Sequence, residues 1–167
     1  GVVISDLKSA LKDYGDIIKD KINSNPLNTS EDKFLALELS SFDSGIFVYI
    51  PRNVIVDDSI RIIEALAPDG TSSIVRNIVV IESNSKASIV QELYSNNRFD
   101  DKIQQSLFEL LECYVGSNSE LEVVTLQAMN EKNAVNFSNR KGFIEKDAKI
   151  SWYMGLFAAQ LSRYKLD

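Results

Sequence analysis

A single thiol and the absence of imidazole define the chemistry open to this chain. Its 167 residues contain one cysteine, Cys113, and no histidine. Without histidine the chain cannot form Ser-His-Asp or Cys-His catalytic sets or a His-ligated zinc site. One cysteine cannot make an internal disulfide or supply all the ligands of an iron–sulfur cluster. We therefore expect any metal-dependent role to need a partner, and a reducing compartment fits this cysteine content.

The charged residues do not indicate a catalytic or nucleic-acid-binding site. The acidic pairs Asp57-Asp58 and Asp100-Asp101 are typical of turns rather than of paired catalytic carboxylates. The formal charge is −6, and lysine and arginine are scattered, with Arg140-Lys141 as the densest group. Because phosphate binding needs clustered cations, we expect no nucleic acid partner.

No segment predicts a membrane anchor or a signal peptide. The longest apolar stretches, such as Ile46–Ile50, are far shorter than the roughly 20 residues that span a bilayer. No charged segment followed by an apolar run opens the chain. We expect a cytoplasmic protein without membrane contact. The start at Gly1 suggests a trimmed tag or an excised fragment.

The first 44 residues predict a helical segment. Leu7, Leu11, Tyr14, Ile18 and Ile22 recur at helical spacing and form one apolar stripe. A second short helix is expected to start near Thr29-Ser30 and to end before Asp43-Ser44-Gly45.

From Gly45 onward the apolar period changes to two, which predicts strands. The turn Pro68-Asp69-Gly70 and a polar interruption over 95–101, with a loop or short helix at Asn96-Asn97, separate some of them. We expect strands at Ile46–Ile50, Val54–Val56, Ser59–Leu66, Val75–Ile81, Ala87–Leu93, Leu107–Val115, Leu121–Met129, Ala134–Phe137, Gly142–Glu145, Ile150–Phe157 and Gln160–Tyr164. No helix is expected after the interruption.

The strand region contains a weak internal echo. Residues 81–90 resemble 115–124, and 144–152 form a looser third copy; each is a strand, a polar corner and another strand. Asn84 and Asn118 occupy equivalent corners and are expected in left-handed or turn conformations; no longer asparagine ladder is visible. Hairpins of a β-sandwich could produce such corners. Repeats of this size also fit a stacked β-helix.

Several motifs, in this order, resemble the SufB/SufD family of iron–sulfur cluster assembly proteins. The matching segments are 33–37, 42–54, 76–81, 87–92, 125–127, 136–142 and 148–152. The resemblance runs from about residue 33 to Trp152 and implies a mainly β fold: a right-handed parallel β-helix over 45–167, preceded by the N-terminal helical segment 1–44.

Two departures from the SufB pattern make the resemblance SufD-like. SufB-type members carry a Gly-Cys pair just after the strand matching 89–92, where this chain has Glu92-Leu93-Tyr94. They also carry a tryptophan shortly after the glutamine matching Gln127, where this chain has Met129. Sulfur transfer needs a thiolate. The resemblance therefore implies a scaffold subunit and not an enzyme.

The resemblance also implies four candidates for a sulfur path: Cys113, Gln127, Arg140 and Lys141. Arg140 keeps the positive charge of a SufB-type lysine, which suits an anionic persulfide. Against these roles, Cys113 shares a strand face with Leu111 and fits a buried core residue without a cation to lower its pKa. Arg140 and Lys141 also fit an ordinary solvated corner.

By resemblance, a SufC-type ATPase and a SufB-type subunit are the partners, and ATPase activity belongs to the former. No cofactor is expected on this chain alone; an iron–sulfur cluster would form only in the assembled complex. Family members continue past this point, so we expect a solenoid truncated at Asp167. Either its open end pairs with a second copy in a homodimer, or the natural protein is longer. The alternative is a polysaccharide-binding or polysaccharide-processing β-helix, which the lack of a signal peptide, a reduced cysteine and the lack of an evident aspartate cluster disfavour.

Overall fold

The computed structural model describes residues 1–66, 72–95 and 102–167. The predicted Pro68–Gly70 turn, the Asn96-Asn97 loop and the Asp100-Asp101 pair lie outside these residues. Within them, no helix is long and apolar enough to cross a membrane.

The N-terminal segment forms three α-helices and one strand. Strand β1 (Val3–Asp6) leads into α1 (Leu7–Asp13) and α2 (Gly15–Ser24), and a 3₁₀ turn, η1 (Thr29–Glu31), precedes α3 (Lys33–Ser41). The predicted single stripe is thus two helices, because Tyr14 leaves helical geometry at φ −126° and ψ 18°. The Asp6 carboxylate caps α1 by accepting from Ser9 N, and Asp32 caps α3 by accepting from Phe34 N and Leu35 N.

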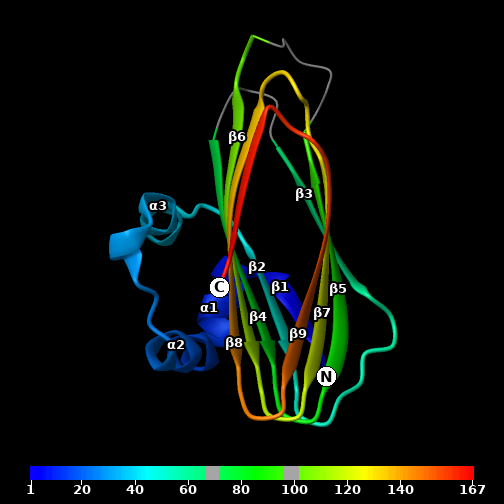
Figure 1. Ribbon diagram of the computed structural model, residues 1–167. Coiled ribbons are helices and arrows are strands. Elements are labelled where there is room, and N and C mark those ends of the chain that lie inside the picture. Colours follow the sequence, from blue (N-terminus) through cyan, green and yellow to red (C-terminus); the bar gives the residue numbers. More distant parts are fainter. Residues whose placement is uncertain (67–71, 96–101) are drawn as a thin grey trace.

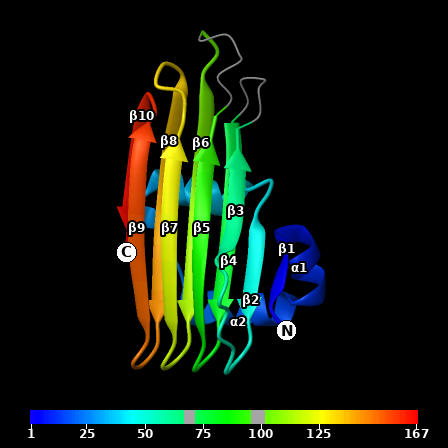
Figure 2. The same ribbon diagram turned by 90° about the vertical axis from the view of Figure 1, so that its right-hand side faces the viewer.

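The remaining strands alternate between two facing sheets (Figures 1 and 2). The six-stranded sheet has the order β1-β2-β4-β6-β8-β10, and the four-stranded sheet has the order β3-β5-β7-β9. The bounds are β2 (Ile46–Ile50), β3 (Ile60–Ala65), β4 (Ser72–Ile81), β5 (Lys86–Tyr94), β6 (Gln105–Val115), β7 (Glu120–Ala128), β8 (Ala134–Ile144), β9 (Lys149–Ala158) and β10 (Leu161–Leu166). The predicted Val54–Val56 strand makes only an isolated bridge at Ile55, and Ala134–Phe137 and Gly142–Glu145 belong to one strand, β8.

The mainly β character is confirmed, but the fold class predicted from the resemblance, a right-handed parallel β-helix or solenoid, is wrong. The chain has one mixed and one parallel sheet, since β1 runs antiparallel to β2, and three helices lie on one face. The physical reason is that a sequence echo reports only which strands pair in parallel. It does not report how the sheets are arranged or what joins their edges.

The echo itself marks true parallel pairs. Lys86 pairs with Glu120 and Glu120 with Lys149, so the predicted corners stack on one another. Asn84 and Asn118 have φ values of 59° and 58°, as predicted, and Asn53 adopts the same geometry at 61°. Asn118 Nδ2 donates to Asn84 Oδ1 at 3.2 Å, and Asn84 Nδ2 donates to Asn53 Oδ1 at 3.1 Å, so the asparagine ladder is one residue longer than the sequence suggested.

The helices cover the outer face of the six-stranded sheet (Figure 1). Leu7, Ala10 and Ile18 pack on Phe47 and on neighbouring outward side chains of β4 and β6. On α3, Phe34 stacks on Phe108 and Phe137 with ring centroids 6.1 and 4.2 Å away.

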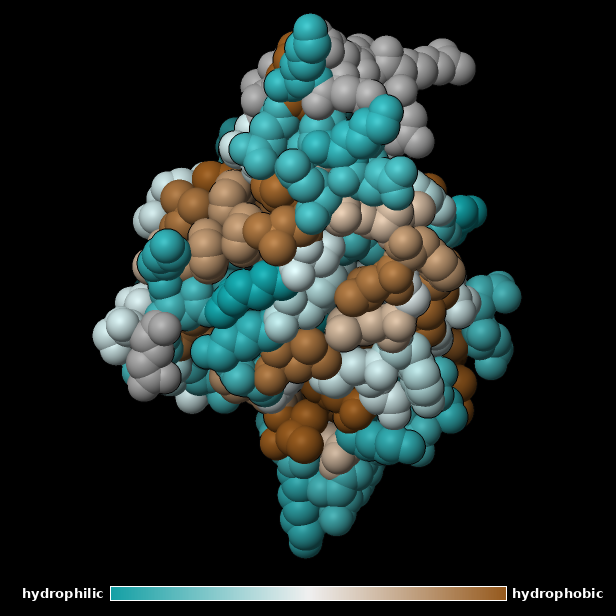
Figure 3. Space-filling view, turned by 45° about the horizontal axis from the view of Figure 1, so that its top comes forward, coloured by the Kyte–Doolittle hydropathy of each residue, from teal (hydrophilic) through white to brown (hydrophobic). Residues whose placement is uncertain are grey.

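The last strand of each sheet forms an edge: β10 in the six-stranded sheet and β9 in the four-stranded sheet. Tyr153, Phe157 and Leu161 are exposed there, and Figure 3 shows apolar patches among polar side chains on the face it presents.

Candidate functional site

The space between the two sheets is apolar at both ends and polar in the middle. One apolar cluster includes Val79, Ile89, Cys113 and Leu121, and a second includes Leu66, Val75, Leu93, Leu107 and Met129. Between them, the strands contribute inward polar side chains. We call this set the interior polar layer: Glu64, Asn77, Gln91, Glu109, Thr125, Gln127, Asn136, Ser138, Arg140, Ser162 and Tyr164.

Arg140 is the cation of this layer. Its side chain is wholly buried, and Nη2 donates to Gln91 Oε1 at 2.8 Å and to Glu109 Oε2 at 3.1 Å. Its guanidinium lies 5.3 Å from the centroid of the Tyr164 ring. Nε and Nη1 have no hydrogen-bond partner. Arg140 therefore neutralises a buried carboxylate and retains donors that could bind an anion.

Glu109 and Glu64 share the amide groups that lie between them. Asn77 Nδ2 donates to Glu64 Oε1 at 2.5 Å and to Glu109 Oε1 at 3.4 Å. Gln91 Nε2 donates to the same two oxygens, at 3.1 Å for Glu64. Burial, and secondarily the charge of Glu109, raises the pKa of Glu64 to about 8. Glu64 therefore holds a proton at neutral pH.

Gln127 organises the opposite end of the layer. Its Oε1 accepts from Asn136 Nδ2 at 2.9 Å and from the Tyr164 hydroxyl at 2.7 Å. Its Nε2 donates to Ser162 Oγ at 2.7 Å and to the Ala158 carbonyl at 3.0 Å. Tyr164 thus contacts both Gln127 and the guanidinium of Arg140, which links two of the four sequence candidates.

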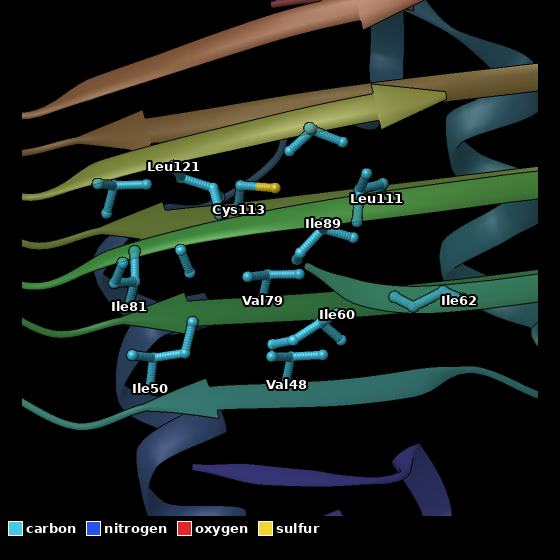
Figure 4. Close-up of a cluster of buried hydrophobic side chains, with 13 residues drawn as sticks. Val48, Ile50, Ile60, Ile62, Val79, Ile81, Ile89, Leu111, Cys113 and Leu121 are labelled. Carbon is cyan, nitrogen blue, oxygen red and sulfur yellow. The ribbon is translucent and has the colours of Figure 1, made fainter. Parts of the chain in front are cut away.

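Cys113 lies in the apolar cluster and not in the polar layer. Its side chain is fully buried, and Figure 4 shows its sulfur among aliphatic side chains, including Ile89, Leu111 and Leu121. Burial raises the pKa of the thiol, and this effect outweighs the opposing charge of Arg140. The thiol is therefore protonated and shielded, which agrees with the expectation of a core residue.

Lys141 points away from the other three candidates. Adjacent residues of a strand face opposite sides, so Arg140 points inward and Lys141 outward. The Lys141 ammonium pairs with the Asp167 carboxylate at the edge of the larger sheet. The structure thus brings Gln127 and Arg140 together, places Cys113 nearby but outside the layer, and separates Lys141 from all of them.

Comparison with known proteins decides the family of the chain. Residues 64–167, more than half of it, match the domain described as "SUF system FeS cluster assembly, SufBD core domain". The chain belongs to the SufBD core family. This confirms the resemblance found in the sequence.

Curated relatives agree with this family. The SufBD chain is 22% identical over 157 residues to the iron–sulfur cluster assembly protein SufD of Bacillus subtilis, covering 93% of this chain and 35% of that protein. It is 18% identical over 162 residues to SufBD family proteins of Staphylococcus haemolyticus and Staphylococcus epidermidis, covering 97% of this chain and 34% of each. It therefore spans about a third of their length. None of these relatives supports the polysaccharide alternative.

Sequence reasoning missed most of the polar layer of this SufBD chain. Three of its residues are each flanked on the inward face of their strand by apolar residues: Asn77 by Val75 and Val79, Gln91 by Ile89 and Leu93, and Glu109 by Leu107 and Leu111. A polar residue between apolar neighbours was the available signal, but a single strand cannot show that polar residues of six or more strands meet at one level. Among the described residues, no three His, Cys, Asp or Glu side chains are grouped to hold a metal ion.

Proposed function

We propose that this chain forms part of a SufD-like scaffold subunit of iron–sulfur cluster assembly. The observation that carries the proposal is the match of residues 64–167 to the SufBD core. The similarity to SufD of Bacillus subtilis supports the SufD-like assignment. The subunit acts by holding other proteins in place and not as an enzyme.

The setting of the only cysteine supports the scaffold role. A sulfur acceptor needs a thiolate, and Cys113 lies in an aliphatic core where burial raises its pKa. The chain alone has too few ligands for a cluster. We propose that a cluster forms only when a SufB-type subunit supplies the thiols and a SufC-type ATPase supplies the ATP-driven movement, in the cytoplasm.

Of the four sulfur-path candidates, the geometry favours Gln127 and Arg140. Both lie in the interior polar layer, and Arg140 has two unpartnered donor nitrogens that could stabilise a persulfide or thiolate anion. Cys113 is a core residue in this proposal. Lys141 lies outside the layer and pairs with Asp167 at the edge of the larger sheet.

The proposal is tested with the full-length protein. It is mixed with the SufC-type ATPase and SufB-type subunit of the same source, isolated by affinity pull-down, and reconstituted anaerobically with iron and sulfide. We expect a stable complex whose cluster absorbance requires the partners. Lack of a complex, or cluster uptake by this protein alone, would refute the scaffold role.

Substitutions at the adjacent residues Arg140 and Lys141 test whether cluster formation depends on the inward-facing cation or on the loss of any positive charge from this strand. Arg140→Lys keeps the buried charge and is expected to retain most cluster formation, whereas Arg140→Gln should reduce it severalfold within an intact complex. Lys141→Gln, on the outer face, is the matched control and should behave like the parent protein. Equal cluster yields for Arg140→Gln and Lys141→Gln would remove Arg140 from the path.

A further inference from the structure

A cavity of about 390 Å³ opens at the end of the molecule opposite the β9/β10 edge. It lies where β2, β3 and β4 meet, and the residues that line it come from the start of β2, the end of β3, the first half of β4 and two neighbouring strands. They are Asp6, Ser44, Gly45, Ile46, Ile63, Glu64, Ala65, Leu66, Ser73, Val75, Asn77 and Leu107. Its volume is in the range of small-molecule sites.

The cavity results from the short length of β2. Phe47–Ile50 pair with Ile78–Ile81, the second half of β4. Its first half contacts the chain before β2 through the bridge from Ser44 to Val75 and a hydrogen bond from Asp43 N to the Ile74 carbonyl. Strand β2 has 5 residues and β4 has 10, and Figure 2 shows both near this edge. Gly45 keeps the chain close to β4, because a Cβ there would lie 1.8 Å from the Arg76 carbonyl oxygen. The chain before β2 therefore lies directly against β4 on this side of the cavity.

The ionisable side chains among the lining residues that the structure describes are both acids, Asp6 and Glu64; the other polar side chains are the neutral Ser44, Ser73 and Asn77. Glu64 lies at its inner side, where Oε1 already accepts from Asn77 and Gln91 while Oε2 is buried without a hydrogen-bond partner. At the rim, hydrogen bonds from Ser9 lower the pKa of Asp6, which is therefore ionised. No lysine or arginine is among the lining residues that the structure describes. This pattern selects a ligand that donates hydrogen bonds and carries positive charge.

The composition of the cavity lining favours an organic cation over a metal ion as the ligand. Ile46, Ile63, Leu66, Val75 and Leu107 make most of the lining apolar, and in the described part of the chain no three ligating side chains are grouped. A hard metal cation prefers several oxygen ligands. An alkyl or aryl body would bury apolar area against these walls while its ammonium group reached Glu64.

We propose that this cavity binds a small primary amine in its ammonium form, with the Glu64 carboxylate as the acceptor of its N–H groups. Since Glu64 is protonated at neutral pH when the cavity is free, binding transfers its proton to the solvent and leaves an ion pair. Gln91 connects this site to the proposed sulfur path, because its Nε2 donates to Glu64 Oε1 while its Oε1 accepts from Arg140 Nη2. The test must therefore also measure whether the assembly partners still bind.

Benzylamine is a suitable probe, with benzyl alcohol and benzoate as neutral and anionic compounds of similar shape. Isothermal titration calorimetry of the full-length protein at pH 7, in two buffers of different ionisation enthalpy, measures both affinity and proton release. We expect benzylamine to bind at least tenfold more tightly than either comparator and to release close to one proton. Absence of benzylamine binding, or equal binding of benzyl alcohol, would overturn the proposal.

Glu64→Gln tests the acceptor, because glutamine preserves shape and can accept from Asn77 and Gln91. It should weaken benzylamine binding at least tenfold and abolish proton release. Glu122→Gln, on the outer face of the four-stranded sheet, is the matched control and should leave both unchanged. Circular dichroism verifies folding, and unchanged binding by a folded Glu64→Gln protein would disprove the role of Glu64. Pull-down of the assembly partners by this variant separates failure here from failure of the scaffold role.

Discussion

At the scale of single residues, Arg140 is the side chain on which the buried charge balance depends. It is wholly buried beside the equally buried Glu109, which also accepts from Ser138 Oγ at 2.7 Å. Removing one member of a buried pair leaves the other charge without compensation. The adjacent Lys141 has its charge pair at the sheet edge, where solvent reaches Asp167.

We predict that Arg140→Met lowers the free energy of unfolding by about 3–5 kcal/mol, whereas Lys141→Met lowers it by less than about 1 kcal/mol. Urea denaturation followed by circular dichroism measures both. The comparison controls for the loss of a long cationic side chain from the same strand. Similar losses for the two variants would contradict the assignment of Arg140 to the buried layer.

Glu38 predicts a pH dependence of stability. It is completely buried on α3, and Asn139 Nδ2 donates to its Oε2 at 2.8 Å. Its pKa is raised from 4.5 to about 8, mainly by burial and also by the charges of Glu109 and Asp32, while the hydrogen bond from Asn139 and the charge of Arg163 oppose the shift. Between these pH values the folded state binds more protons than the unfolded state. Stability therefore falls as pH rises from about 4.5 to 8, and Glu64 acts in the same direction.

Glu38→Gln should have parental stability near pH 4 and exceed it by more than about 1 kcal/mol at pH 9, because the amide stays neutral. Urea unfolding across this range measures the difference. Glu131→Gln, at an exposed position, is the control and should follow the parental curve. A parental pH profile for Glu38→Gln would contradict the buried, protonated state of this carboxyl group.

At the scale of elements, α3 is attached to the larger sheet by a few specific contacts. Phe34 stacks on Phe108 and Phe137, and the guanidinium of Arg163 lies 5.4 Å from the Phe34 ring centroid. Arg163 Nη2 also donates to Asp32 Oδ2 at 2.7 Å. These contacts connect the helix to β6, β8 and β10, so its position depends on strands far along the chain.

Phe34→Ala should reduce the free energy of unfolding by roughly 2 kcal/mol, because a partly buried ring and its stacking are lost. Hydrogen exchange should accelerate in α3 more than in β5. Phe157→Ala is the control, since Phe157 is 74% exposed on β9. Equal acceleration of α3 and β5 exchange would show that the stacking does not attach the helix separately.

At the scale of the whole molecule, the sheets are built from parallel pairs between distant residues. Ser85 N, for example, donates to Ser119 Oγ across 34 residues of chain. We predict refolding in milliseconds to seconds, because loop closure must precede most of the stabilising contacts. Stopped-flow fluorescence of Trp152 measures this rate. Complete refolding within microseconds would contradict it, and double-jump experiments control for slow proline phases.

The sequence by itself determined the mainly β character, the helical N-terminal segment, the stacked corners at Asn84 and Asn118, and the SufBD family. Each depends on a local pattern or on ordered motifs: helical spacing, alternation, and turn residues that tolerate positive φ. These signals are carried by consecutive residues, so they are readable without the fold.

Only the tertiary structure decided how the sheets face one another, that Gln127 and Arg140 meet in one polar layer, and that Cys113 lies in the apolar cluster beside it. It also decided the positions of Glu64 and Glu38. Their burial depends on strands and helices tens of residues away, as in the bond from Asn139 to Glu38 across 101 residues. The pKa of a carboxyl group depends on solvent exclusion and neighbouring charges, which the chain acquires only when it packs.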